Sequence, residues 1–530
     1  MKRNILKIIA LCLCAALLLG GCGLIDLDAL LAPEPIPFSE MEYSRPDVGK
    51  VKQAVQGVEE KLDEKAKIEP LMDSIYAFYE EYHNFYTNFS LANIHYFKDM
   101  TDLYWDEEYD YCLGVETEVS SLLDQLLYKL ADCPLREELE AEEYFGPGFF
   151  DDYEGESLWD EVFTALMSQE AKLLEEYYSI SAKALEVPAY TDVWYNTYGD
   201  PLARLYARLI TLRNQIAEYA GYEDYPSFAY EFYYYRDYTP TQAESLMEQI
   251  RRELAPLYQK VMTTDIWYLS MQESSEKQTF DYVKNSANAM GGTVKEAFRQ
   301  LEKNDLYDIS YGENKYEASF EVYLTSYYSP YIFVNPTLRV DDKLTFAHEF
   351  GHFCNDYASY GTVAGVDVAE VFSQGMEYLS LCYGQDTGKL EIIKLADSLG
   401  VYVEQALYAS FEHQAYALET PTAEELCGLF AQAGKDFGFS EDVWDGRSFV
   451  YVPHFYSNPL YVISYVVSND AAMQIYEMER QEKGKGLALL EENLATEEGC
   501  FLAFVESAGL MSPFAEGRVT DVRKLLEELL

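Results

Sequence analysis

The chain has 530 residues, more than one domain usually contains, and its hydrophobic content of 49% indicates a globular protein with a large core. It carries 92 acidic and 39 basic residues, a net charge of −53, which argues against nucleic acid as a partner because phosphate binding needs a cationic face. The simplest interpretation is a solvated acidic surface, and a cavity that attracts basic substrates is the alternative.

The N-terminus has the pattern of a secretory signal. Lys2, Arg3 and Lys7 precede an apolar stretch that ends in Leu-Gly-Gly-Cys at residues 19–22, which resembles the lipobox of bacterial lipoproteins. We therefore expect residues 1–21 to be a signal peptide that is removed before Cys22. The sulfur of Cys22 would then carry the lipid and hold the protein at the membrane, outside the cytoplasm. An uncleaved anchor, or a plain signal with a chance cysteine, is the alternative.

The pattern of the following residues predicts three further segments. Residues 22–47 contain several prolines and are expected to form a lipidated, extended tether. Residues 48–204 form an N-terminal helical region, with apolar residues at helical spacing in 48–65, 71–97, 116–131 and 159–185. The remaining residues, 205–530, form the region that carries the chemistry.

Within this last region one stretch is predicted to be strand and the rest helix. Thr239-Pro-Thr-Gln242 has the pattern of a helix cap and predicts one long helix to about residue 271. Residues 316–334 are rich in β-branched and aromatic residues, with Pro330 and Pro336 as punctuation, and predict a small sheet. Helix resumes at residue 344. The fold class is thus mainly α, with a small β-sheet next to the motif described below.

Six cysteines follow Cys22, at 112, 133, 354, 382, 427 and 500. None is part of a Cys-x-x-Cys pair, so a zinc site with sulfur ligands is not expected. Their wide spacing predicts no disulfide framework, and buried free thiols are the simplest expectation.

The motif His-Glu-Phe-Gly-His occupies residues 348–352 in a chain that has only six histidines. On a helix, residues i and i+4 lie on one face, so His348 and His352 can both bind one metal ion. Glu349 is rotated away from them and can act as general base on a zinc-bound water. The alternative is a pair of core histidines without a metal.

A catalytic zinc site needs a third protein ligand, and Glu370 is the best candidate. It follows His348 by 22 residues, beyond a glycine-bounded break that allows the chain to turn into a second helix. Glu377 lies two helical turns further on the same face and could orient a ligand histidine. Asp356, four residues after His352, is the alternative for this role, and a solvated surface acid is the simpler interpretation of either.

HEFGH followed by AEVFSQGMEYL resembles the thimet oligopeptidase and oligoendopeptidase F family of zinc metallopeptidases. The resemblance extends over about residues 205–510 in an ordered set of segments. These are RNQIAEYAGY at 213–222, YG at 311–312, YIFVN at 331–335, LYASFEH at 407–413 and PHFYSNPLY at 453–461. Ile463 departs from the family, since many relatives carry an aromatic residue there, and the first 200 residues show no recognisable pattern.

The resemblance implies a two-lobed helical metallopeptidase with a deep central channel that admits short, unfolded peptides. It implies one zinc ion per chain on His348, His352 and Glu370, with Glu349 as base. It also implies that the segment around His454 contacts substrate and transition state, and we assign Tyr461 and Tyr465 to the same wall. The spacing leaves the choice among Tyr456, Tyr461 and Tyr465 open.

The expected function is a zinc-dependent endopeptidase that acts on short oligopeptides at the outer face of the membrane, as a monomer. A first alternative is a dipeptidyl- or carboxypeptidase of the related helical-channel families, which also combine H-E-x-x-H with a downstream glutamate. A second is a catalytically silent lipoprotein that binds peptides. The intact Glu349 argues against the second alternative, because a binding protein does not need a general base.

Overall fold

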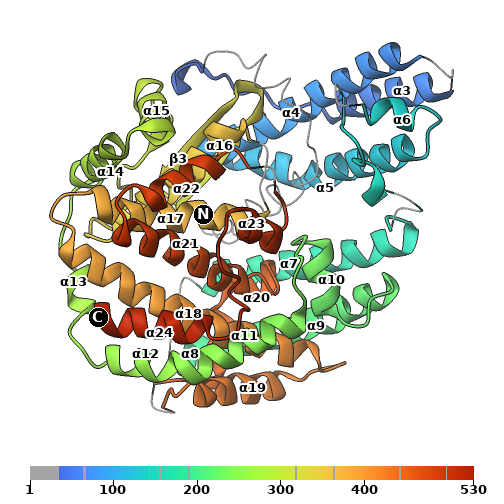
Figure 1. Cartoon of the computed structure of the whole chain (residues 1–530). Helices are drawn as coiled ribbons and strands as arrows, with labels where there is room; N and C mark the ends of the chain where they lie inside the picture. The colour runs from blue at the N-terminus through green and yellow to red at the C-terminus, as the bar shows by residue number, and fades with distance from the viewer. Residues whose placement is uncertain are drawn as a thin grey trace.

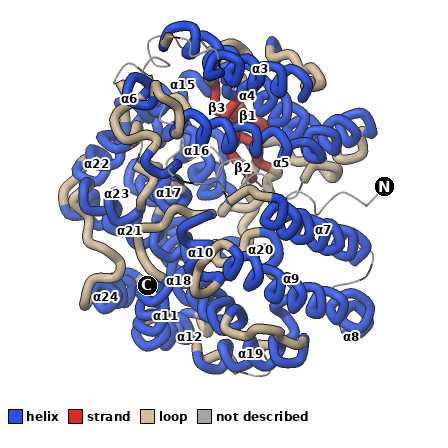
Figure 2. The backbone as a smooth tube through the Cα atoms, turned by 90° about the vertical axis from the view of Figure 1, so that its right-hand side faces the viewer, coloured by secondary structure: helices blue, strands red, loops and turns tan. Residues whose placement is uncertain are grey.

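The computed structural model describes residues 35–530 except 64–66, 142–143, 154, 156–157, 185–186, 188–190, 317–318, 362–364, 441–442 and 497. The predicted signal peptide and Cys22 lie outside the described residues. The fold is mainly α-helical, as predicted, with one small sheet (Figures 1 and 2). The helices before the sheet are α3 (Val48–Asp63), α4 (Ile68–Lys98), α5 (Leu103–Ala131), α6 (Arg136–Leu139), α7 (Glu161–Ala184), α8 (Asp192–Trp194), α9 (Asp200–Tyr219), α10 (Tyr225–Phe232), α11 (Pro240–Glu253), α12 (Ala255–Val261), α13 (Trp267–Ser270), α14 (Glu276–Met290) and α15 (Gly292–Lys303).

The sheet has three strands in the order β1-β3-β2, formed by β1 (Tyr307–Asp308), β2 (Ser319–Leu324) and β3 (Ser329–Val334). β2 and β3 pair antiparallel, and β1 runs parallel to β3. The predicted strand region is therefore a hairpin. Pro330 lies inside β3 opposite Tyr323 rather than bounding the strand. The helices that follow are α16 (Asp342–Ser359), α17 (Val366–Tyr383), α18 (Gly388–Tyr416), α19 (Ala423–Asp436), α20 (Pro453–Ser457), α21 (Ile463–Gln481), α22 (Lys485–Asn493), α23 (Phe501–Ser507) and α24 (Arg518–Leu529).

The long helix predicted for residues 242–271 is wrong. Thr239 does form a capping box with Gln242 at the start of α11, but the helix ends at Glu253. Pro256 follows in the first turn of α12. A proline inside a helix removes a backbone donor and clashes with the preceding turn, so the chain forms the shorter helices α11, α12 and α13 instead.

The predicted tether is packed against the body where the structure describes it. The backbone N–H of Phe38 donates to Asn304 O at 2.9 Å, and its ring lies 4.3 Å from that of Tyr331. Met41 is buried, and Arg45 pairs with Glu108 of α5. The predicted boundary between residues 204 and 205 falls inside α9, so no linker separates the two regions there.

Helix α17 is the centre of the site-bearing half of the molecule. It packs between α16 and α21, and α16 also packs against β2, β3, α14 and α15 (Figure 1). Gly351 of α16 allows this contact, because a Cβ atom there would lie 2.5 Å from Phe372 O and 2.6 Å from the Cα of Ser373. The helix that carries the HEFGH motif and the helix that carries Glu370 are thus in contact through their backbones.

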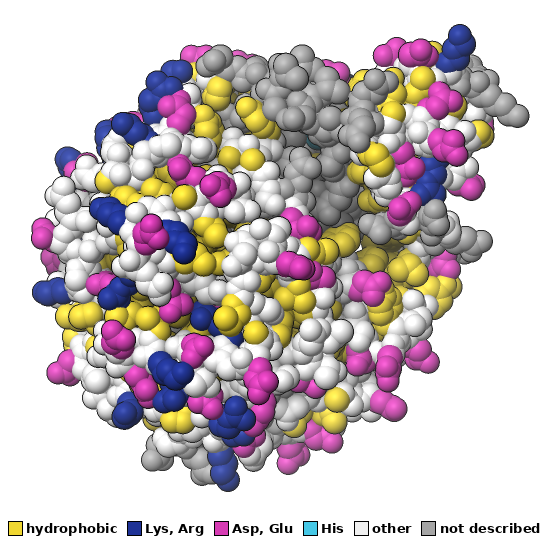
Figure 3. All heavy atoms as spheres, viewed as in Figure 1, with side chains coloured by type: hydrophobic (Ala, Val, Ile, Leu, Met, Phe, Trp, Pro, Cys, Tyr) yellow, Lys and Arg dark blue, Asp and Glu magenta, His cyan; other side chains and the backbone are white. Residues whose placement is uncertain are grey.

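Aromatic residues fill much of this core, which accounts for many of the 48 tyrosines. Tyr206, Tyr225, Tyr378 and Tyr402 are among the largest fully buried side chains. The six described cysteines are free, as expected, but only Cys112 and Cys354 are buried. On the face seen in Figure 3, acidic and basic side chains are scattered over the surface, with apolar patches between them. In the part of the chain that the structure describes, no helix is both long and apolar enough to cross a membrane.

Candidate metal centre and active site

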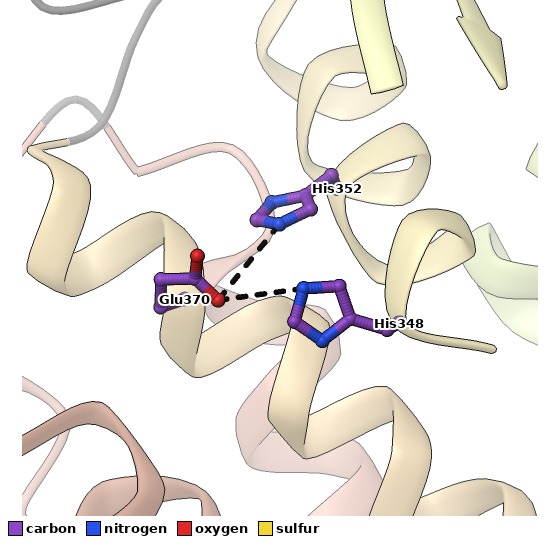
Figure 4. A group of neighbouring side chains, drawn as sticks. All are labelled: His348, His352 and Glu370. Carbon is purple, nitrogen blue, oxygen red and sulfur yellow. Dashed lines mark ion pairs between the residues drawn. The ribbon is translucent and has the colours of Figure 1, made fainter. Parts of the chain in front are cut away.

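The two histidines of α16 and one glutamate of α17 converge in space (Figure 4). Glu370 Oε2 lies 3.5 Å from His348 Nε2 and 4.0 Å from His352 Nε2. Zinc bonds of about 2.0–2.1 Å in a tetrahedral arrangement place ligand atoms about 3.4 Å apart, so the donor set and spacing fit a zinc ion. Within the described residues, the structure thus brings together the three side chains that the sequence indicated as ligands.

Glu377, one of two residues considered for orienting a ligand, contacts His348. The Nδ1 of His348 lies 2.9 Å from Glu377 Oε1, and the other carboxylate oxygen lies 2.9 Å from the ammonium group of Lys394. With Nδ1 engaged by this carboxylate, Nε2 is the nitrogen that faces Glu370. Asp356 has a different partner, since its carboxyl group pairs with Glu321 of β2. The alternative role considered for Asp356 is therefore not supported by the contacts.

Burial and the charged partners act in opposite directions on the pKa values of His348, Glu377 and Lys394. Burial by itself would lower the pKa of His348, but the hydrogen bond to Glu377 and the charge of Glu370 raise it to about 9. Burial would raise the pKa of Glu377, yet Lys394 and His348 hold it below its usual value. Lys394 is itself buried in α18, and its pKa is raised despite burial by the charge of Glu377.

Glu349 is buried beside the cluster and faces the edge strand of the sheet. Its side chain hydrogen-bonds to Ser319 at the start of β2. Burial is the main reason that the pKa of Glu349 rises to about 7, while His348 and Ser319 act in the opposite direction. A carboxyl group with a pKa near neutrality suits a group that must both accept and release a proton.

The aromatic wall predicted from the sequence lies next to Glu370, but its residues differ in their contacts and in their exposure. The hydroxyl of Tyr461 donates to Glu370 Oε1 at 3.2 Å, and Ser373 Oγ donates to Oε2 at 2.8 Å. The ring of Tyr461 stacks on that of His454 at 5.6 Å, and Tyr465 packs edge-on against both rings. His454 and Tyr465 are half-buried, whereas Tyr461 is fully buried.

The third tyrosine considered for this wall is part of the core. Tyr456 is fully buried, and its hydroxyl donates to Leu202 O at 3.2 Å. Burial lowers the pKa of His454 to about 4, so this imidazole is neutral at physiological pH and can donate one hydrogen bond. Of the wall residues, His454 and Tyr465 retain accessible surface, whereas the hydroxyl of Tyr461 is buried and hydrogen-bonded to Glu370.

Sequence reasoning missed Lys394 and Ser373, which complete the contacts of Glu377 and Glu370. Ser373 lies three residues after Glu370, so helical spacing could have indicated it. The signal for Lys394 is a single charge on the apolar side of α18, close to Leu390 and Leu399. A lysine is almost never fully buried unless it is paired, so its position predicts an acidic partner without identifying it.

Sequence families match two adjacent parts of the chain. Residues 38–157 match the Peptidase M3 N-terminal domain, and residues 161–264 match the angiotensin-converting enzyme family. Oligopeptidase PepF of Bacillus subtilis (strain 168) is 26% identical over 238 residues, which is 40% of this chain and 35% of that protein. The alignment thus spans about a third of the relative's length.

Solved structures match over nearly the whole chain. A protein named as an oligoendopeptidase F from Bacillus anthracis has a TM-score of 0.77 at 21% identity, covering 94% of this chain and 98% of its own. PZ peptidase A with an inhibitor has a TM-score of 0.79 at 18% identity, covering 93% and 98%. These likenesses show a mainly helical fold shared with proteins that are named as peptidases. The comparisons confirm the predicted resemblance to the oligoendopeptidase F family.

Proposed function

We propose that the protein is a zinc-dependent endopeptidase that hydrolyses short, unfolded oligopeptides, with Glu349 as general base. The observation that carries this proposal is the convergence of His348, His352 and Glu370 with a buried carboxyl group beside them. A zinc ion held by these three side chains would supply Lewis-acid chemistry, polarising the peptide carbonyl and lowering the pKa of a coordinated water.

The protein's own groups have separate roles in this reaction. Glu349 takes a proton from the attacking water and delivers it to the leaving amine, a role that suits a buried carboxyl group beside the ligands. His454 and Tyr465 donate hydrogen bonds to the oxyanion that develops on the carbonyl. Glu377 and Tyr461 hold the ligands His348 and Glu370 in place through the contacts described above.

Cleavage of a nonapeptide blocked at both ends tests this function. The proposal expects mass spectrometry to find internal cuts, activity that a chelator abolishes and zinc restores, and no cleavage of a folded domain. Removal of residues only from peptides with a free C-terminus would favour the dipeptidyl- or carboxypeptidase alternative. The match of residues 161–264 to the angiotensin-converting enzyme family is the reason to test this alternative. Binding without any turnover would favour the silent peptide-binding protein.

We also propose that the enzyme works at the outer face of the membrane, held by a lipid on Cys22. This proposal is supported by the charged start, the apolar stretch and the Leu-Gly-Gly-Cys sequence at residues 19–22. In cells fed a labelled fatty acid, the wild type should carry the label and sediment with membranes, whereas the Cys22→Ser variant should not. Equal labelling or equal membrane association of the two would contradict the anchor.

A further inference from the structure

Tyrosines within and after α10 enclose one arginine. The guanidinium carbon of Arg236 lies 4.4 Å from the ring centre of Tyr230, 4.3 Å from that of Tyr234 and 5.6 Å from that of Tyr238. The side chain of Arg236 has no exposed surface. A planar guanidinium stacks on aromatic faces and presents several donors in fixed directions, which a lysine cannot reproduce.

The donors of Arg236 join the wall of the site to the helix that carries Glu370. Nη1 donates to Leu460 O at 3.0 Å, and Nη2 donates to Ser464 Oγ at 2.8 Å and to Tyr461 O at 3.4 Å. Nε lies 3.4 Å from Asp367 Oδ2. Asp367 precedes Glu370 by three residues on α17, so one side chain connects both elements that meet at the Tyr461–Glu370 hydrogen bond.

The flanking tyrosines reinforce the same two connections. The hydroxyl of Tyr234 donates to Pro459 O at 2.8 Å, and that of Tyr238 donates to Asp367 Oδ2 at 2.8 Å. The side-chain contacts of Arg236, Tyr234 and Tyr238 described above thus connect to the turn at 459–464 and to Asp367.

The turn that receives these bonds has an unusual backbone. Leu460 has a φ of 64°, a left-handed conformation that is uncommon for a residue with a side chain. Its N–H donates to Glu412 Oε1 at 2.8 Å, while its carbonyl binds Arg236. Such a conformation persists only when the surroundings hold it, and here it directs the next residue, Tyr461, toward Glu370.

We propose that Arg236, aided by Tyr234 and Tyr238, is a positioning residue that sets the Tyr461 hydroxyl on Glu370 and thereby fixes the third metal ligand. This inference deepens the proposed function and rests on it, since it takes Glu370 as a metal ligand. The competing explanation is that Arg236 and Asp367 form a core ion pair that only stabilises the fold.

Zinc affinity, measured by competition with a chromophoric chelator, separates the two explanations. Loss of a residue that orients a ligand weakens metal binding by about 10–100-fold, and we expect this for Arg236→Gln and for Tyr461→Phe. The double variant should be no weaker than the weaker single variant, because both changes act through one hydrogen bond. Arg236→Lys should be intermediate, since it keeps the charge opposite Asp367 but not the paired carbonyl contacts.

Arg518→Gln is the matched control. Arg518 is also a buried arginine, and its Nε donates to both oxygens of Asp470 at 3.0 Å. Within the described part of the chain, its ion pairs go to Asp470 and Glu477 and not to the metal cluster. Its zinc affinity should stay within about twofold of wild type. Where Arg236→Gln does not fold, Tyr234→Phe, which removes the hydroxyl that binds Pro459 O, should still weaken zinc binding several-fold.

Three results would overturn the inference. The first is that Arg236→Gln and Tyr234→Phe leave zinc affinity unchanged. The second is that the effects of these two changes multiply with that of Tyr461→Phe. The third is that Arg518→Gln weakens zinc binding as much as Arg236→Gln does. In each of these cases a wild type that binds zinc and cleaves peptides leaves the proposed function standing. A wild type that binds no zinc would overturn both.

Discussion

Single side chains decide whether the cluster on α16 and α17 can hold a metal ion. His348 presents Nε2 to Glu370 because its Nδ1 is engaged by Glu377, and Glu377 is held in turn by Lys394. Such contacts fix both the tautomer and the orientation of a ligand histidine. The chain Lys394–Glu377–His348 is therefore as much a part of the proposed site as the ligands are.

Removing the charge of Glu377 should weaken metal binding. We expect Glu377→Gln to reduce zinc affinity by about 10–100-fold, because His348 loses its carboxylate partner. Asp356→Asn is the control, since Asp356 pairs with Glu321 instead of a histidine, and its zinc affinity should remain close to that of the wild type. A larger loss in Asp356→Asn than in Glu377→Gln would reverse the roles that the contacts assign.

The residues of the site differed in how far the sequence could predict them. His348, His352 and Glu349 follow from helical spacing within one short motif, and Glu370 follows from the next helix. The contact of Tyr461 with Glu370 joins the turn before α21 to α17, and that of Lys394 with Glu377 joins α18 to α17. No local period encodes either pair. Tertiary packing decided these pairs, and it also placed Tyr456 in the core.

At the scale of elements, the close approach of α16 and α17 determines where Glu370 lies. The sequence predicted both helices and the small sheet, since their patterns are local. It did not predict the two-residue strand β1, which is too short to show a period, and it overlooked the break at Pro256. Gly351 is the residue that allows the two site-bearing helices to touch.

Gly351→Ala should damage both stability and metal binding. The added methyl group would meet the backbone at Phe372 and Ser373, and overpacking of this kind typically costs about 1–3 kcal/mol of unfolding free energy. As α17 moves away, Glu370 should also separate from the histidines, so zinc affinity should fall. In the control Gly400→Ala, the added atom would lie 3.6 Å from Tyr258, an ordinary contact, and stability should not fall. Equal behaviour of the two variants in urea unfolding would contradict this account.

The turn before Tyr461 should make stability depend on pH through Glu412. Burial raises the pKa of this carboxyl group to about 8, while the Leu460 N–H, Arg213 and Arg236 act in the opposite direction. Its second oxygen has no hydrogen-bond partner among the described residues. Below a pH of about 4.5 the group is protonated in both the folded and the unfolded chain, and above it the unfolded chain ionises first.

The contribution of Glu412 to stability is therefore complete at low pH and is lost as the pH rises toward about 8. Glu412→Gln keeps the neutral form at every pH. Urea unfolding of both proteins between pH 5 and 8 should show the variant gaining stability relative to wild type as the pH rises. A difference that does not change with pH would show that Glu412 is ionised in the folded protein.

The whole molecule carries a net charge of −53, and its field acts on any charged substrate. We expect kcat/KM for a basic peptide to exceed that for a neutral peptide of equal length at low ionic strength. The advantage should shrink as salt shortens the Debye length from about 30 Å at 0.01 M to about 8 Å at 0.15 M. Identical salt dependence for the two peptides would contradict this expectation and show that the acidic residues only keep the surface solvated.

The measurement that tests the central claim most directly combines zinc content with peptide cleavage for wild type and Glu349→Gln. The account predicts one zinc ion per chain in both proteins, and cleavage of an end-blocked nonapeptide by the wild type alone. That result would show that Glu349 is not needed to bind zinc but is needed for the chemistry. A wild type without zinc or turnover, or a Glu349→Gln variant with full activity, would contradict it.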